Sequence, residues 1–312
     1  MSEGAAAGAP RFPWRRYAAP RHWPTWAGLG LLWLLTRLPF DTVLAAGRRL
    51  GPMVLRLLAE RARATRINIA LALPTLDAAG RERIAHASAR HAGMSAMELA
   101  WLWCRPHEGI DARATLLGTG HVDAALAAGR GVILLQAHFS VIDRAGSVIG
   151  RRWRATGVYD PPKDPLIAAL QLWHRRPYLD EPIPNRNVRS MVRRLRRGEM
   201  VWFSPDQAVS VRNGGVATRF FDQPVLSSSG TARILAMTGA TVIPMVPERS
   251  RDGRHLTVHF HPPVTFDTTD TVRATQAVND LLEAQVRSLP EQYLWGHKRF
   301  KPPPGTVPGP YR

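Results

Sequence analysis

The second half of the chain alternates short apolar runs with helical stretches, and this alternation restricts the possible fold more than any other feature. The apolar runs cover residues 132–137, 200–203, 241–246 and 256–260, and helices are expected near 121–129, 165–175, 186–197 and 229–239. Short apolar runs are typical of strands buried on both faces, and strands separated by helices are typical of an α/β fold. We therefore predict an α/β fold with a central, mostly buried sheet flanked by helices.

The first half of the chain predicts an N-terminal membrane-anchor helix. The run from Trp23 to Thr36 carries no charge and lies between Arg21-His22 and Arg37. Its length corresponds to about 21 Å of helix, less than the ~30 Å hydrocarbon core, so Arg37 would have to snorkel if the segment crossed a bilayer. We expect the anchor at residues 23–40, a single domain at 41–312 and mobile ends at 1–22 and 302–312. The alternative is a buried core helix.

The charge of the chain predicts an anionic partner. The formal net charge is +18, from 42 basic and 24 acidic residues, and all of the basic residues except Lys163, Lys298 and Lys301 are arginines. Such a chain can bind nucleic acid, an anionic membrane surface, or an acidic substrate or carrier protein. With one cysteine, Cys104, and no His-Glu-x-x-His run, we expect neither an internal disulfide nor a metal site.

Two basic segments leave the kind of partner open. Residues 186–197 carry six arginines around an apolar helical stripe. This stretch can lie on anionic lipid or receive an acidic carrier protein, and the alternative is a packed helix with a solvated face. Residues 293–301 mix aromatic rings with cations, as surfaces for single-stranded nucleic acid do. No nucleic-acid-binding motif accompanies them, so we expect no nucleic acid partner.

The best candidate for catalysis follows the first buried strand, where His138 and Asp143 lie five residues apart. On one continuous helix they would point about 140° apart. They can meet if His138 lies on the turn that leaves the strand and Asp143 lies in the following helix. We predict that Asp143 orients His138, which then acts as a general base, and Ser140 stays open as a nucleophile. The alternative is a structural histidine that caps a helix.

Several collinear motifs give the chain a family resemblance. They are Pro20-Arg-His-Trp-Pro-Thr-Trp26, Arg66-Ile-Asn68, Ala137-His-Phe-Ser-Val-Ile-Asp143, Leu170-Gln-Leu-Trp-His-Arg175, Gly198-Glu-Met-Val-Trp-Phe-Ser-Pro-Asp-Gln207, Ser227-Ser-Ser-Gly-Thr231 and Pro290-Glu-Gln-Tyr-Leu-Trp-Gly-His-Lys-Arg-Phe-Lys301. Together they resemble the late acyltransferases of lipid A biosynthesis, within the wider group that carries a His-x4-Asp/Glu motif. The resemblance runs over nearly the whole chain from about Pro20.

The resemblance implies a reaction and a site. The family transfers a fatty acyl chain from acyl-carrier-protein to a hydroxyl of a Kdo-bearing lipid A precursor. The reaction takes place on the cytoplasmic side of the bacterial inner membrane, among its lipids, and without a further cofactor. The resemblance implies His138 and Asp143 as the catalytic pair, and Arg175, Asp206 and Gln207 as substrate-binding residues. Arg175 is suited to a phosphate or to the developing thioester oxyanion.

Three positions depart from the family pattern and leave the acceptor open. Asp143 stands where glutamate is usual, Asp160 replaces the arginine of a Tyr-Arg-Pro motif, and Ala208 replaces a second acidic residue. Lys163 remains a nearby candidate for a lipid phosphate. An acyltransferase acting on a lysophospholipid or an aminoacyl lipid is therefore an alternative. A non-catalytic basic protein that binds membranes or nucleic acid is an alternative of another class.

Overall fold

The fold is built on a mixed central sheet in the computed structural model, which describes residues 12–105, 108–153, 155–180, 182–306 and 308–311. Seven of the nine strands found in these residues form this sheet, in the order β1 (Ala114–Leu117), β9 (Leu256–Phe260), β8 (Thr241–Arg249), β2 (Val132–Leu135), β5 (Met200–Phe203), β3 (Thr156–Tyr159) and β4 (Ile183–Pro184). Neighbouring strands are parallel except β8 and β9, which are antiparallel. The other two strands, β6 (Gly215–Phe220) and β7 (Gln223–Ser228), form a separate antiparallel pair. The four strands predicted from the sequence are confirmed.

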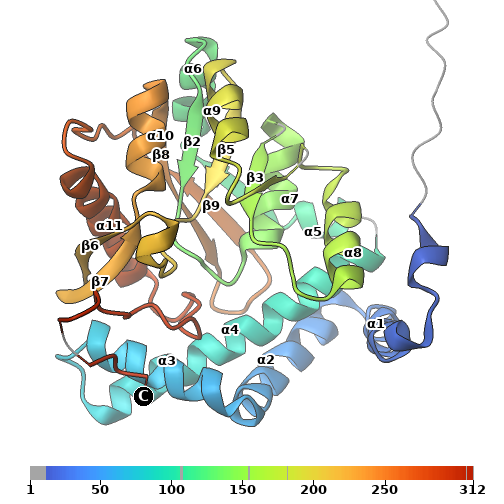
Figure 1. Cartoon of the computed structure of the whole chain (residues 1–312). Helices are drawn as coiled ribbons and strands as arrows, with labels where there is room; N and C mark the ends of the chain where they lie inside the picture. The colour runs from blue at the N-terminus through green and yellow to red at the C-terminus, as the bar shows by residue number, and fades with distance from the viewer. Residues whose placement is uncertain (1–11, 106–107, 154, 181, 307, 312) are drawn as a thin grey trace, which may run out of the picture.

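Helices cover both faces of the sheet (Figure 1). They are α6 (Thr119–Ala127) and α7 (Ile142–Trp153) on one face, and α9 (Val188–Arg196), α10 (Gly230–Thr238) and α11 (Thr271–Ser288) on the other. Right-handed crossovers explain this division, because the connections β2–α7–β3 and β4–α9–β5 run in opposite directions along the sheet. The expected α/β fold with a buried sheet flanked by helices is thus confirmed.

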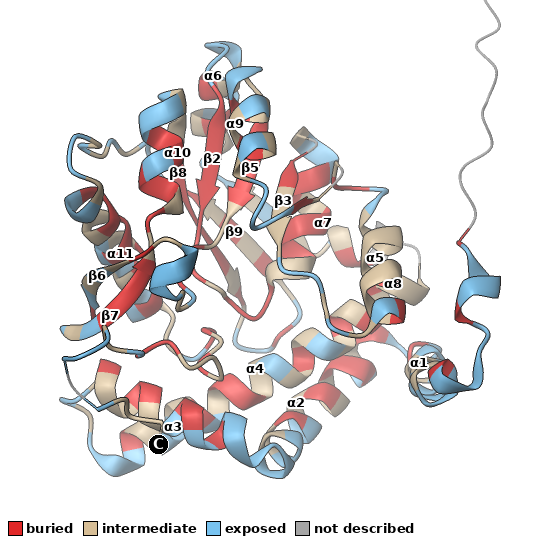
Figure 2. Ribbon diagram, viewed as in Figure 1, coloured by how far each residue is buried: buried red, intermediate tan, exposed pale blue. Residues whose placement is uncertain are grey.

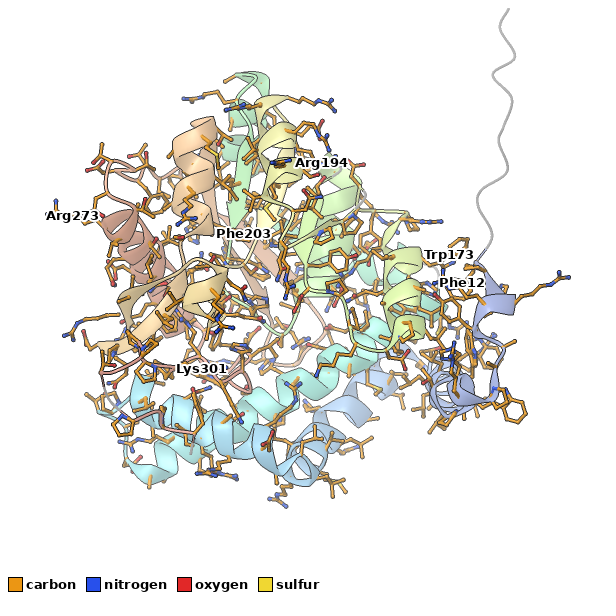
Figure 3. All side chains as sticks on the ribbon, viewed as in Figure 1. Phe12, Trp173, Arg194, Phe203, Arg273 and Lys301 are labelled. Carbon is orange, nitrogen blue, oxygen red and sulfur yellow. The ribbon has the colours of Figure 1, made fainter. Side chains whose placement is uncertain are left out.

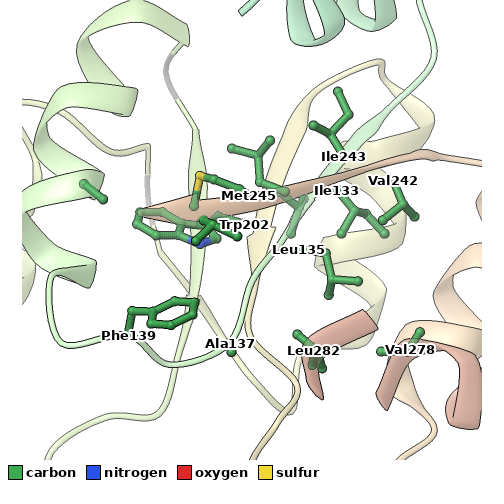
Figure 4. Packing of buried hydrophobic residues seen from close by; sticks show 14 of the residues in the cluster. Ile133, Leu135, Ala137, Phe139, Trp202, Val242, Ile243, Met245, Val278 and Leu282 are labelled. Atoms are coloured by element: carbon green, nitrogen blue, oxygen red, sulfur yellow. The ribbon is translucent and has the colours of Figure 1, made fainter. Parts of the chain in front are cut away.

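The sheet forms the centre of the hydrophobic core. All four residues of β2 are buried, and the strands appear as buried segments between partly exposed helices in Figure 2. Figure 4 shows Ile133 and Leu135 of β2 packed beside Ile243 of β8 and Leu282 of α11. Such burial on both faces explains why these strands read as continuous apolar runs rather than as alternating patterns.

A second layer, made of helices, lies along the carboxyl ends of the parallel strands. It comprises α2 (Phe40–Leu57), α3 (Ala59–Ala72) and α4 (Ala78–Cys104), which run below the sheet in Figure 1. Helices α2 and α4 pack antiparallel through glycines, with Gly47 opposite Gly93 and Gly51 opposite Ala89. A Cβ atom on Gly93 would lie 2.1 Å from the carbonyl oxygen of Gly47, so the two backbones can approach this closely only without side chains.

We expect the Gly93→Ala variant to lose about 1–3 kcal/mol of stability, because overpacking forces the two helices apart. The matched control is Gly120→Ala in α6, where a Cβ would meet no atom within 4 Å and helix propensity favours alanine. Urea denaturation of the two variants checks the expectation. Equal stability of both variants would show that the α2–α4 contact is not a close one.

Helix α1 (Trp23–Leu35) is shorter than the predicted anchor segment. The helix ends at Leu35, and Phe40, expected at the end of the anchor, instead begins α2 and is buried beside Leu44 and Met94. None of the α1 residues is buried, so the alternative of a core helix is wrong. Within the described residues, no helix has both the length and the apolar character needed to span a bilayer.

The segments expected to be mobile make specific contacts where they are described. Residues 12–22 form two short 3-10 turns, η1 (Trp14–Tyr17) and η2 (Pro20–His22). Phe12 is buried, and its ring lies 5.8 Å from that of Trp173 on α8 (Pro165–Arg175; Figure 3). Near the other end, the Tyr311 hydroxyl donates a hydrogen bond to Asn68 of α3. Residues 1–11, 307 and 312 of the predicted mobile ends lie outside the described residues.

Candidate active site

Two parallel neighbouring strands bring His138 and Asp206 together. In the β2–β5 register Leu135 is opposite Phe203, and each of the two functional residues follows its strand end by the same three positions. Because the carboxyl ends of parallel strands meet at one edge of a sheet, equal offsets place the two side chains side by side. This edge faces the layer of α2, α3 and α4 (Figure 1).

Asp206 binds both the backbone and the ring of His138. The His138 backbone N–H donates to Asp206 Oδ2 at 3.0 Å, and ring atom Nδ1 is hydrogen-bonded to Oδ1. The Asp206 side chain is 1% exposed, whereas that of His138 is 26% exposed. The flanking Ala137 and Phe139 are buried in the core (Figure 4). The ring is therefore held at Nδ1 and presents Nε2 to the solvent-accessible side.

Electrostatics favour the ionised carboxylate and a basic imidazole. Burial alone would lower the pKa of His138, but the Asp206 carboxylate outweighs it, so the pKa is raised above its usual value. Burial would likewise raise the pKa of Asp206, but its interactions with His138 and Tyr293 hold that pKa well below its usual range. The Asp206 carboxylate is therefore negatively charged, and it is hydrogen-bonded to a His138 ring that can accept a proton.

The predicted pairing of His138 with Asp143 is wrong in this structure. His138 lies on the turn after β2 and Asp143 in the first turn of α7, as expected, but their side chains have different partners. Asp143 Oδ1 accepts hydrogen bonds from Arg175 Nη2 and, at 3.1 Å, from Nε. The start of α7 lies beside the C-terminal end of α8. The Asp143 carboxylate is therefore paired with the Arg175 guanidinium and not with the His138 imidazole.

The other predicted site residues separate into two groups. Gln207 approaches His138, with its Nε2 atom 3.3 Å from the ring Nε2 atom. Arg175 lines a different, small cavity of about 50 Å³ together with Asp143. Lys163 is exposed in the loop between β3 and α8 and lines neither that cavity nor the one that contains His138. The structure thus brings Asp206 and Gln207 to the histidine, but not Arg175 or Lys163.

Ser140 is placed in the buried interior rather than in the cavity. Its hydroxyl accepts a hydrogen bond from Arg249 Nη1 at 3.2 Å, and its backbone N–H donates to the Gln292 carbonyl at 2.8 Å. Arg249 is itself paired with the buried Glu98. These contacts give Ser140 the role of fixing the loop after His138, and they do not support it as a nucleophile.

A mostly apolar cavity of about 500 Å³ opens at His138. Its walls come from α2, α3, α4 and the C-terminal segment, and they include Leu50, Val54, Leu55, Leu58, Ala89, Ala92, Ala96, Met97, Leu294 and Trp295. Asp206 and Gln207 line the same cavity at its polar end. The arrangement can hold a hydrocarbon chain with a reactive polar group beside the imidazole.

Three ionisable residues of this cavity were not predicted as site residues from the sequence, namely Arg61, Tyr293 and His297. Burial, the largest cause, together with neighbouring positive groups lowers the pKa of His297 to about 4. The sequence did single out the aromatic and basic run that contains Tyr293 and His297, as a possible nucleic-acid surface. Tyr293 and Trp295 are 5% and 1% exposed, so their rings cannot stack on bases, and that interpretation is wrong.

The arginine-rich helix predicted at 186–197 is α9, which covers one face of the sheet and ends beside the amino ends of β2 and β5. Helix α9 buries Met191 and Leu195, and the Leu195 carbonyl packs against Gly131, which precedes β2. Arg194, labelled in Figure 3, pairs with Glu199 at 2.8 Å. The basic face of α9 is therefore at the amino ends of β2 and β5.

In the described part of the chain, no cluster of three His, Cys, Asp or Glu residues can hold a metal ion.

Comparison with known proteins identifies the family. The sequence profile described as bacterial lipid A biosynthesis acyltransferase matches residues 11–302. The chain is 31% identical to the lipid A biosynthesis lauroyltransferase of Escherichia coli K12, over 94% of this chain and 96% of that protein. It is 30% identical to the palmitoleoyltransferase of the same strain, over 93% and 95%. It is 28% identical to a lipid A biosynthesis acyltransferase of Haemophilus influenzae, over 92% and 93%. The resemblance seen in the motifs is thus confirmed, and the chain belongs to the bacterial lipid A biosynthesis acyltransferases, a family of enzymes.

Proposed function

We propose that this enzyme transfers a fatty acyl chain from an acyl-carrier-protein thioester to a hydroxyl of a Kdo-bearing lipid A precursor. His138 acts as the general base and Asp206 orients it. The observation that carries the proposal is the His138–Asp206 pair at the polar end of an apolar cavity. Such a cavity suits an acyl chain, since each buried methylene contributes about 0.8 kcal/mol.

The proposed step needs only the two substrates and the imidazole. His138 Nε2 takes the proton of the acceptor hydroxyl as its oxygen attacks the thioester carbonyl. The new C–O bond forms in this attack and gives a tetrahedral intermediate, whose collapse restores the C=O bond and breaks the C–S bond. The imidazolium then gives its proton to the departing thiolate. Asp206 stabilises the imidazolium while it exists, because its carboxylate is ionised and hydrogen-bonded to Nδ1.

Positive charge at the cavity suits anionic substrates. Arg61 lines the cavity from α3, and its side chain is exposed. A Cβ atom on Gly296 would lie 3.9 Å from its guanidinium, so this charge is beside the C-terminal wall of the cavity. Both the carrier arm and the lipid acceptor bear phosphates, which an arginine binds through two parallel hydrogen bonds.

We propose a site at the cytoplasmic face of the inner membrane, and the exposed apolar side chains support contact with a lipid surface. Of the fifteen exposed large apolar residues in the described chain, eleven lie between Trp14 and Leu58. They include Trp23 and Trp33 of α1 and Leu57 of α2, which is 84% exposed. Tryptophan is favoured at the boundary between lipid and water. We propose that α1 and the outer face of α2 anchor the enzyme there, with the cavity open toward the lipid acceptor.

An acceptor assay tests the proposal. The purified enzyme would receive acyl-carrier-protein thioester and, in separate reactions, the Kdo-bearing lipid A precursor, a lysophospholipid or an aminoacyl lipid. We expect mass spectrometry to show one added acyl group on the lipid A precursor alone. Acylation of only one of the other two acceptors would overturn the proposed substrate, and mass spectra of lipid A from a deletion strain would show the same choice in cells.

The pH dependence of kcat/KM distinguishes the two carboxylates. The base must be neutral, and Asp206 raises the pKa of His138, so activity should fall as the pH decreases through an inflection above the ordinary histidine value of about 6.5. In Asp206→Asn the inflection should move to lower pH, since the carboxylate no longer stabilises the imidazolium. In Asp143→Asn it should stay in place, whatever the loss of activity. A shift only in Asp143→Asn would restore the pairing expected from sequence.

A further inference from the structure

His297 is a second histidine in the wall of the active cavity, and the proposed step does not use it. It lines the cavity together with His138, Asp206 and Gln207. Its ring atom Nδ1 is buried and has no hydrogen-bond partner within the described residues. Leaving a buried polar atom without a partner costs about 1–3 kcal/mol, so a cavity-lining residue that carries such an atom calls for a functional explanation.

The backbone around His297 is fixed from two sides. Asn68 of α3 donates a hydrogen bond from Nδ2 to the His297 carbonyl at 2.6 Å. On the other side, the Leu294 backbone N–H donates to the His138 carbonyl at 3.0 Å. The segment that carries His297 is thus bound directly to the loop that carries His138. A group held in this way is preorganised relative to the reacting atoms.

The lowered pKa of His297 favours the neutral form of its ring at physiological pH. Burial and the neighbouring positive groups, His138 among them, lower its pKa to about 4. A neutral imidazole cannot serve as the acid that protonates the thiolate, but it still has one N–H donor. It can therefore donate a hydrogen bond to an oxygen atom that becomes negatively charged, without giving up its own proton.

We propose that His297 is a further catalytic residue, whose ring N–H donates a hydrogen bond to the thioester carbonyl oxygen and stabilises the oxyanion. When the acceptor oxygen forms its bond to the carbonyl carbon, the C=O electron pair moves onto this oxygen. The pair returns when the C–S bond breaks, and the acceptor's proton remains on His138 until it passes to the thiolate. The sequence suggested Arg175 for this charge, but Arg175 lines a different cavity. This inference rests on the proposed function.

A phenylalanine variant separates this role from a structural one. We expect His297→Phe to lower kcat by about 10²–10³-fold, with KM unchanged, because one oxyanion donor contributes that much. Its melting temperature should be unchanged or higher, since the substitution removes the unpartnered ring nitrogen. The pH inflection from His138 should not move. Lys298→Ala is the control, because the exposed Lys298 side chain points to Glu60, 3.7 Å away, and should leave all four values unchanged.

Two amide variants identify the donating atom. His297→Asn places an amide nitrogen near the position of Nδ1, and His297→Gln places one near Nε2. We expect one of the two to recover most of kcat and the other to resemble His297→Phe. Recovery by neither amide, or wild-type kcat in His297→Phe, would overturn the assignment. A failure of the proposed function itself would look different, because the wild-type enzyme would then transfer no acyl group in the same assay.

Discussion

Replacing His138 with glutamine is expected to lower kcat of acyl transfer by about 10²–10⁴-fold, the usual contribution of a general base. Glutamine retains a polar side chain of similar length but cannot accept the hydroxyl proton at neutral pH. The fold should be preserved, because the His138 side chain is 26% exposed and borders the cavity. Steady-state kinetics with saturating donor and acceptor measure the loss, and thermal unfolding checks the fold.

Two variants complete this experiment. Asp206→Asn keeps the shape of the side chain but removes the charge that stabilises the imidazolium, so a loss approaching that of His138→Gln is expected, up to about 10⁴-fold. The exposed His86 on α4 provides the matched control, and His86→Gln should keep wild-type kcat. Full activity in His138→Gln would show that the reaction does not pass through this imidazole.

The Glu98→Gln variant is expected to lose about 3–5 kcal/mol of stability, the cost of breaking a buried ion pair. Glu98 is 2% exposed and lies between two arginines whose side chains are fully buried. It accepts a hydrogen bond from Arg144 Nη1 at 2.9 Å and is also bound by Arg249. Removing its charge leaves two guanidinium groups in the interior without a counterion.

The control for Glu98 lies on the same helix. Glu82 pairs with Arg66 at 2.9 Å, but both side chains are more than half exposed, so Glu82→Gln should cost less than about 1 kcal/mol. Urea denaturation gives both values. If the two variants lost equal stability, the buried arginines would not depend on Glu98. Arg249 also binds Ser140 in the loop after His138. The residual activity of folded Glu98→Gln would therefore show whether acyl transfer depends on this support of the loop.

Local patterns predicted much of the fold and one half of the His138–Asp206 pair. The continuous apolar run 132–137 gave β2 because a strand buried on both faces needs apolar side chains at every position. His138 followed from its place at the end of that run, where open α/β sheets hold their functional groups. The predicted anchor segment extends past the end of α1, because Phe40 reads as apolar whether it contacts lipid or packs against Leu44 and Met94.

Pairing between distant residues could not be predicted in this way. Asp143 was chosen because it is near His138 in sequence and belongs to the family motif. Its actual partner, Arg175, is the last residue of α8, and the contact depends on how two helices meet. His297 carried no signal of its own beyond a run of aromatic and basic residues. Its burial, which lowers its pKa, follows from packing against α3 and the loop after β2.

The sequence by itself determined the family, four of the strands and the candidate base His138, because periodicity and collinear motifs are properties of neighbouring positions. The tertiary structure alone decided which carboxylate serves that residue. Asp206 lies 68 positions from His138, and the two meet because β2 and β5 are adjacent and in register. Strand order is set by the packing of the whole sheet and its helices, and no local sequence pattern predicts it.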